Sequence, residues 1–173
     1  MFTKLTRLEP LGIITLDEAK NQLNIVDFAD DDAYINSLIL AASDMCERAT
    51  NRLFSLCTVT GQFVAGENSL YLPFSPIQSV SSVLIGIEPV TYEFNEFSEV
   101  LTLTDLTVDP YTNVTVVFNA GYPTADVPHM VKQSCKIIVA DLYANRESII
   151  GDKMTELPMS ALQLLKTTKI ESV

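Results

Sequence analysis

Few side chains of this 173-residue chain have the types and spacing that catalysis or metal binding requires. The single histidine, His129, follows Pro128 in the opening turn of an expected helix. It could serve as a general base, but a histidine at that position is more typical of a surface or capping residue. No Cys or His ligands occur at the short spacing that a zinc site requires. We therefore expect neither a catalytic histidine nor a metal site.

Two groups of carboxylates invite a catalytic or calcium-binding interpretation. The run Asp30 to Asp32 lacks the glycine and the distal glutamate of a calcium loop, and its position favours stabilisation of a helix N-terminus. The acids Glu93, Glu96 and Glu99 alternate with two phenylalanines. That alternation is typical of the solvent side of a β-hairpin.

Cysteine and glycine patterns also argue against a cofactor. Cys46, Cys57 and Cys135 form no CxxC pair and are odd in number, which favours reduced, buried thiols. The glycines are isolated and do not form a phosphate-binding loop. We expect no cofactor and no enzymatic activity.

Charge is distributed unevenly along the chain. Residues 53–131 hold eight acids and no Lys or Arg, within a chain whose formal charge is −11. Proteins bind nucleic acid mainly through clustered cations, so this region cannot bind the phosphate backbone in that way. Residues 132–173, with six bases and five acids, are the part best able to approach an acidic neighbour. A protein partner is the favoured interpretation.

Composition indicates a folded protein. The chain is 47% apolar and 19% charged, which supports a hydrophobic core. No apolar run approaches the roughly 18 residues of a membrane span, and residues 1–10 lack an apolar signal core. We expect a cytosolic protein without a membrane partner.

Helical periodicity occurs at both ends of the chain. Thr15 and Glu18 have the spacing of a capping box, which predicts a helix that reaches Leu23. Apolar residues at three- and four-residue spacing then predict a long helix over 30–53. Pro128 fits the first turn of another helix, and a shorter apolar segment follows near the C-terminus.

The middle of the chain has strand character. β-Branched and aromatic runs alternate with Gly, Pro, Asn and Asp, which predicts several short antiparallel strands. The predicted strands are Cys57 to Val64, Ser69 to Leu72, Ser79 to Ile87, Val90 to Phe94, Val100 to Leu103 and Asn113 to Asn119. Aromatic residues in these runs, such as Phe63, Tyr71, Tyr92 and Phe118, are expected mainly in the core.

The predicted fold is therefore α+β, with a helical core from the N- and C-terminal segments and an inserted antiparallel β region. We expect residues 1–173 to form a single domain. Its parts are a helical part at 13–53, a β insertion at 55–120, a core helix at 127–149 and a C-terminal tail at 150–173.

Several blocks of this sequence, in this order, resemble the head-to-tail connector (adaptor) family of long-tailed bacteriophages. The blocks are Leu16 to Leu23, Asp31 to Ala42 through Glu47, Asn51 to Leu53, Leu70 to Pro73, Pro76 to Val80, Ala120 to Tyr122, Val127-Pro128, Leu142 to Glu147 and Glu156 to Leu165. Two places depart from the family pattern. Residues 23–26 are neutral where the family tends to be basic, and residues 171–173 lack a basic ending.

The resemblance implies a virion structural protein of the neck. Such a subunit forms a ring, expected to be twelvefold, beneath the portal protein, and it docks the next neck or tail protein, a stopper or tail-completion protein. Genomic DNA would pass through the ring without specific binding. The implied location is the virion neck, and the host cytoplasm during assembly.

The C-terminal segment is the candidate for portal docking. Its apolar and basic side chains lie on an otherwise acidic chain: Leu162, Leu164, Leu165, Lys166 and Lys169. The competing interpretation is that this tail folds back on the helical core.

Other functions remain open at this stage. Within the virion, the chain could form another neck ring, as a stopper or tail-completion protein. An acid/base hydrolase would place Glu93, Glu96 or His129 in a deep cleft. A small β-type binding module would instead expose aromatic side chains on its sheet.

Overall fold

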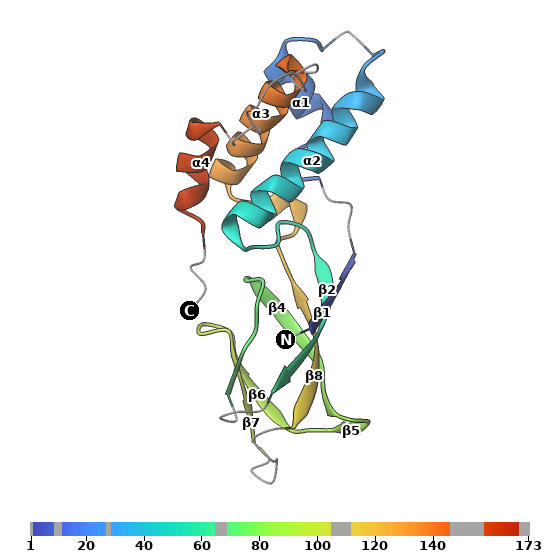
Figure 1. Ribbon diagram of the computed structural model, residues 1–173, viewed down its shortest axis with the longest axis vertical. Coiled ribbons are helices and arrows are strands. Elements are labelled where there is room, and N and C mark those ends of the chain that lie inside the picture. Colours follow the sequence, from blue (N-terminus) through green and yellow to red (C-terminus); the bar gives the residue numbers. More distant parts are fainter. Residues whose placement is uncertain are drawn as a thin grey trace, which may run out of the picture. The chain divides into compact units, whose positions relative to one another are not determined.

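The structure, a computed structural model, describes residues 2–8, 12–26, 29–64, 69–104, 112–145 and 158–169. The chain divides into two compact units (Figure 1). The β unit comprises residues 1–10 and 55–122, and the helical unit comprises residues 11–54 and 123–173. The expectation of a single domain stays a prediction. The predicted α+β class is confirmed.

Two antiparallel sheets form the β unit. The five-stranded sheet has the order β1-β2-β8-β4-β5, and the three-stranded sheet has the order β3-β7-β6. The strands are β1 (Phe2–Arg7), β2 (Cys57–Val64), β3 (Ser69–Tyr71), β4 (Ile77–Ile85), β5 (Glu88–Pro89), β6 (Tyr92–Asn95), β7 (Val100–Leu103) and β8 (Asn113–Ala120). Every predicted strand is present, with bounds that differ by up to two residues.

Alternation of side chains explains the core of this unit. Along β8, Val116 and Phe118 are fully buried, whereas the alternate residues Thr115 and Val117 are partly exposed. Val59 of β2 pairs with Phe118 and is buried on the same face. In the second sheet Leu101 is fully buried and pairs with Leu70. The two inner faces thus supply the apolar core.

Strand β1 was missed by sequence analysis. All six of its residues pair with β2, so the N-terminal segment joins the β unit and not the helical core. Its sequence, with Lys4, Thr6 and Arg7 around one leucine, gives little apolar alternation. Pairing with the long strand β2 therefore decides its conformation. The short strand β5 was also missed, because it is two residues long and contains Pro89.

The helical unit contains four α-helices and one 3₁₀ turn among the residues that the structure describes. They are α1 (Leu16–Leu23), α2 (Asp32–Thr50), η1 (Thr124–Asp126), α3 (His129–Ala144) and α4 (Met159–Lys166). The predicted capping box is confirmed, since Glu18 N–H donates to the Thr15 hydroxyl and Thr15 N–H donates to the Glu18 carboxylate. Helix α2 ends three residues before the predicted Leu53, because Asn51 adopts the left-handed conformation (φ 57°) typical of a helix C-terminus.

Helices α2 and α3 pack against each other through small and β-branched residues. Ile35 and Ala42 of α2 and Val131 of α3 are fully buried. Cys46 and Cys135, on the same two helices, are buried and free, and the third cysteine is buried and free as well. The hydrogen bond with Cys135, together with burial, raises the pKa of the Cys46 thiol, which keeps it protonated. The expectation of reduced, buried thiols is confirmed.

None of the described helices has the length and apolar character that crossing a membrane would require.

Candidate interaction surfaces

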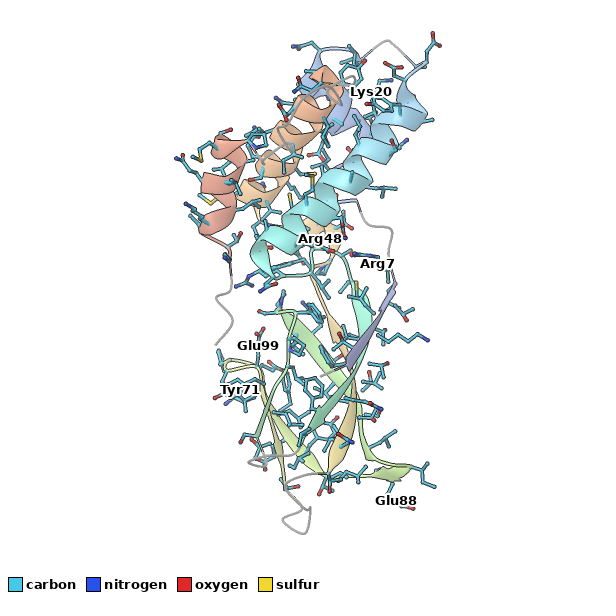
Figure 2. The ribbon with its side chains drawn as sticks, viewed as in Figure 1. Arg7, Lys20, Arg48, Tyr71, Glu88 and Glu99 are labelled. Atoms are coloured by element: carbon cyan, nitrogen blue, oxygen red, sulfur yellow. The ribbon has the colours of Figure 1, made fainter. Side chains whose placement is uncertain are left out.

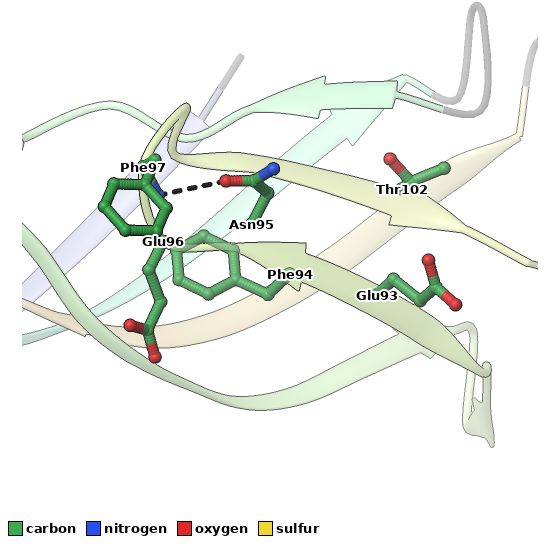
Figure 3. A pocket seen from close by; sticks show the side chains of 6 residues that line it. All are labelled: Glu93, Phe94, Asn95, Glu96, Phe97 and Thr102. Atoms are coloured by element: carbon green, nitrogen blue, oxygen red, sulfur yellow. Dashed lines mark hydrogen bonds between the residues drawn. The ribbon is translucent and has the colours of Figure 1, made fainter.

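The side chains considered for catalysis do not converge. His129 is exposed at the first residue of α3. A hollow of about 490 Å³ on the β6–β7 hairpin is lined by Glu93, Phe94, Asn95, Glu96, Phe97 and Thr102. Figure 3 shows the two carboxylates of this hollow pointing in different directions. Acid/base catalysis by a carboxylate pair needs two groups directed at one substrate, and this arrangement does not provide that.

Glu99 has a structural role in the same hairpin. Its carboxylate accepts a hydrogen bond of 2.8 Å from the Ser75 hydroxyl and one of 3.1 Å from the Ile77 backbone N–H. These bonds tie the β6–β7 turn to the start of β4. Glu99 directly precedes Val100, which pairs with Tyr71 in the three-stranded sheet; both Glu99 and Tyr71 are labelled in Figure 2.

Two of the three aspartates at the start of α2, Asp31 and Asp32, make contacts within the helical unit. The Asp31 carboxylate accepts a hydrogen bond of 2.6 Å from the Tyr143 hydroxyl, and Asp32 forms a 2.8 Å salt bridge with Lys20. Asp31 is the N-cap residue but makes no side-chain capping bond, so its carboxylate serves to join α2 to α3. Within the described ranges, no group of three potential metal ligands occurs.

The C-terminal segment folds onto the helical unit as helix α4. Ala161 is fully buried and Leu165 is 2% exposed. The Ser134 hydroxyl of α3 donates to the Ala161 carbonyl, and Arg52 Nε donates to the Thr168 carbonyl at 2.6 Å. Residues 158–169 thus follow the competing interpretation, in which the tail packs on the core. Residues 150–157 and 170–173 of the expected tail lie outside the described residues.

The predicted docking residues consequently differ in accessibility. Leu165 is inside the unit, Leu162 and Leu164 are half-buried, and Lys166 and Lys169 are exposed. Two exposed methionines, Met130 at the start of α3 and Met159 at the start of α4, were not singled out from the sequence. We call Met130, Met159, Lys166 and Lys169 the α3–α4 patch. Helix α4 carries no acid, so the patch has a basic end.

Lys136, a basic residue of α3, forms a contact within the helical unit. Lys136 forms a 3.1 Å salt bridge with Glu18 of α1. Partial burial raises the pKa of Glu18, but the hydrogen bond from Thr15 N–H and the charge of Lys136 outweigh burial and lower that pKa overall. The contact therefore joins α1 to α3.

Aromatic residues of the β unit divide into core and surface. Phe63 and Phe118 are buried and Tyr92 is half-buried, as expected, whereas Tyr71 is 78% exposed. Phe97, at the β6–β7 turn, is 102% exposed, and sequence analysis did not select it. Asn95 gave a local signal for a turn here, because an asparagine side chain often accepts a hydrogen bond from the backbone N–H two residues on, but it gave no signal for the exposure of Phe97.

A family comparison confirms the resemblance seen in the sequence. The sequence model described as "Phage gp6-like head-tail connector protein" matches residues 13–88, which include α1, α2 and strands β2 to β4. No curated protein matches the chain significantly.

Solved structures of gene transfer agent (GTA) particles contain chains with the same fold. One comes from the neck of an empty GTA particle computed with C6 symmetry: identity is 17%, the TM-score is 0.74, and the match covers 98% of this chain and 97% of that one. A second, from the virion of a native GTA particle, has 18% identity, a TM-score of 0.72 and coverage of 98% and 96%. A third, from the neck of a native GTA particle computed with C12 symmetry, has 16% identity, a TM-score of 0.62 and coverage of 98% and 97%. These likenesses establish the fold along nearly the whole chain.

Proposed function

We propose that this chain, whose residues 13–88 carry the phage gp6-like head-tail connector sequence, joins the head of a virion to its tail. It is a structural protein of the virion neck. The observation that carries this conclusion is the family match, and the fold shared with chains of GTA necks supports it.

Assembly into a ring follows from the same proposal. A closed ring is built from heterologous contacts, in which two different patches of one subunit meet those of its neighbours. The β unit and the helical unit offer surfaces of different chemistry for this purpose. Two of the similar chains come from necks computed with C6 and C12 symmetry, which supports a ring of six-fold or twelve-fold symmetry. We favour twelve copies.

The charge of the chain suits a passage for DNA. Twelve copies at −11 each would carry about −130. An acidic wall repels the phosphate backbone, so a duplex slides past it without being held. Such a conduit needs no catalytic step, and we therefore propose that the chain is not an enzyme.

Portal protein is the partner that we assign to the α3–α4 patch. Lys166 and Lys169 are exposed and Met130 and Met159 add apolar surface, so the patch offers both charge and anchors to a partner. The buried Leu165 then supports the patch from inside the unit and does not touch the portal. On the other side of the ring, we propose that a stopper or tail-completion protein docks.

A charge reversal tests this assignment. Lys166→Glu should weaken binding to the purified portal protein of the same phage about tenfold, measured by sedimentation or by surface plasmon resonance at about 0.15 M salt. Arg48→Glu is the matched control, since Arg48 is an exposed base on α2 of the same unit. Equal losses for both variants would contradict the assignment of the patch. Absence of any binding by the unmodified chain would contradict the proposed function.

A further inference from the structure

The β6–β7 turn holds Phe97 in a fixed, fully exposed position. On its N-terminal side, Asn95 Oδ1 accepts hydrogen bonds from the backbone N–H groups of Phe97 (3.0 Å) and Ser98 (3.2 Å). On its C-terminal side, Glu99 is tied to Ser75 and Ile77. The aromatic ring between these ties is 102% exposed, and Figure 3 shows it at the edge of the hollow.

This geometry is typical of an anchor for a protein partner. Aromatic side chains carry much of the binding energy at interfaces, and burying this ring would remove a large apolar surface from water. Because the turn is already ordered by four hydrogen bonds, binding would lose little conformational entropy. Nothing within the described part of the unit covers the ring.

The charge around Phe97 defines the surface that would receive it. Glu96 adjoins Phe97 in the turn, whereas Glu93 lies toward the other end of the hollow (Figure 3); both are exposed and form no ion pair with another described residue. A receiving surface should therefore be free of acids and carry at least one base.

The outward face of the five-stranded sheet meets that requirement. We call it the hydroxyl face; its register places on one side Lys4, Thr6, Thr58, Thr60, Gln62, Ser79, Ser82, Leu84, Thr115, Val117 and Asn119. None of these residues is acidic, and Lys4 is exposed at the β1 edge. The Thr58 hydroxyl donates to Asn119 Oδ1, and Asn119 Nδ2 donates to the Ser79 hydroxyl. These cross-strand bonds link β2, β8 and β4 across the face.

We propose that the Phe97 turn of one copy docks on the hydroxyl face of the next copy, with Glu96 near Lys4. The proposal rests on the function proposed above and names the contact between neighbouring subunits. The hydroxyl face points away from the core that the two sheets enclose, whereas Phe97 lies in the β6–β7 turn of the other sheet. Donor and receiver are thus different patches of one chain, which is the arrangement that closes a ring.

Photo-crosslinking tests the contact directly. In the full chain, Phe97 is replaced by benzoylphenylalanine, which keeps an aromatic side chain. The protein, mixed with portal protein at about 0.15 M salt, is irradiated, and cross-linked peptides are identified by mass spectrometry. We expect covalent ladders of this chain in which position 97 is joined to peptides from β1, β2, β4 or β8. The same analogue at Ile87 is the matched control, because Ile87 is 89% exposed at another hairpin turn of the unit; it should give no ladder.

A charge swap tests the orientation. Lys4→Glu should weaken self-association in the assembled mixture about fivefold, and adding Glu96→Lys to that variant should restore it. Phe97→Ala should weaken self-association about tenfold or more, whereas Ile87→Ala should leave it within about twofold.

Any of five other outcomes would contradict the proposed contact. These are cross-links from position 97 to position 97, cross-links to the portal or another neck protein, equal ladders from positions 97 and 87, absence of any ladder, or failure of Glu96→Lys to restore association. The portal-binding measurement on the same mixture separates this inference from the proposed function. Portal binding without the predicted cross-link contradicts the contact alone, whereas loss of portal binding in the unmodified chain contradicts the function.

Discussion

The two units of this protein use their charges differently. In the helical unit the described salt bridges join Lys20 to Asp32, Lys136 to Glu18 and Arg48 to Asp44. In the β unit, the exposed charges Lys4, Glu88, Glu93 and Glu96 pair with no described residue (Glu88 is labelled in Figure 2). Charges that bind within a unit stabilise its fold, whereas unpaired charges of opposite sign on different strands are available to a neighbour. The salt bridges of the helical unit thus stabilise its fold and leave Lys166 and Lys169 for the proposed portal contact, whereas the exposed charges of the β unit are available to a neighbouring copy.

The largest expected loss of stability comes from a core substitution in the β unit, which also tests whether the two units unfold separately. Phe118→Ala removes a fully buried ring from the core of the β unit, and we expect a loss of about 3–5 kcal/mol in the free energy of unfolding. Urea unfolding followed by circular dichroism measures the loss, and hydrogen exchange at α3 reports on the other unit. Tyr71→Ala, at an exposed position, should change stability by less than about 0.5 kcal/mol. If α3 stays protected while the strands of Phe118→Ala exchange freely, the single-domain prediction is wrong.

A partly buried ion pair should come next in size. Asp32→Asn leaves the Lys20 ammonium, which is nearly buried, without its carboxylate, and we expect a loss of about 1–3 kcal/mol. Lys20→Met replaces the charge by an apolar chain of similar length and should cost less than Asp32→Asn. Thermal unfolding of both variants gives the comparison. Should Lys20→Met be the more damaging change, the lysine stabilises the unit by packing and not by its pairing with Asp32.

A close contact in the β unit should have an intermediate effect. A Cβ added at Gly61 would lie 2.6 Å from Cε2 of the Phe63 ring, so Gly61→Ala must displace that ring. We expect a loss of about 1–2 kcal/mol. In a double-mutant cycle, Gly61→Ala should cost less in a Phe63→Leu background. Identical costs in both backgrounds would show that the ring is not the obstacle.

The smallest effect concerns Glu18 and pH. Because the pKa of Glu18 is lowered in the folded state, its charge stabilises the protein above the unfolded pKa of about 4.3, and that contribution is lost as the pH falls through the folded-state pKa. Glu18→Gln should therefore be less stable than the unmodified chain at pH 7 by a few tenths of a kcal/mol, since the side chain is partly exposed. Denaturation curves at pH 7 and at successively lower pH should show the difference shrinking as the folded-state carboxylate is protonated. A difference that does not change with pH would assign the effect to the amide and not to the charge.

Local signals explain which parts of the fold were predictable. The capping box at Thr15 fixed the start of α1, and alternation predicted β2 and β8 over nearly their full lengths. Strand β1 could not be predicted, because its conformation depends on pairing with β2, which is distant in sequence. Helix α2 ends before Leu53 because Asn51 adopts the left-handed conformation. The apolar spacing, which continues to Leu53, therefore predicted too long a helix.

The candidate surfaces were only partly predictable for a related reason. The basic end of the C-terminal segment was visible in the sequence, but the burial of Leu165 depends on packing between α3 and α4. Phe97 follows the alternation of a hairpin, so its sequence resembles that of a core residue. Its exposure results from the Asn95 turn and from the tie that Glu99 makes to β4.

Electron microscopy of the purified chain mixed with the portal protein of the same phage tests the central claim most directly. The account predicts a ring of this chain stacked on the portal, with an open axial passage and with the β units of neighbouring copies in contact. Averaged images that show the portal alone, or single copies of this chain bound at scattered positions, would contradict it.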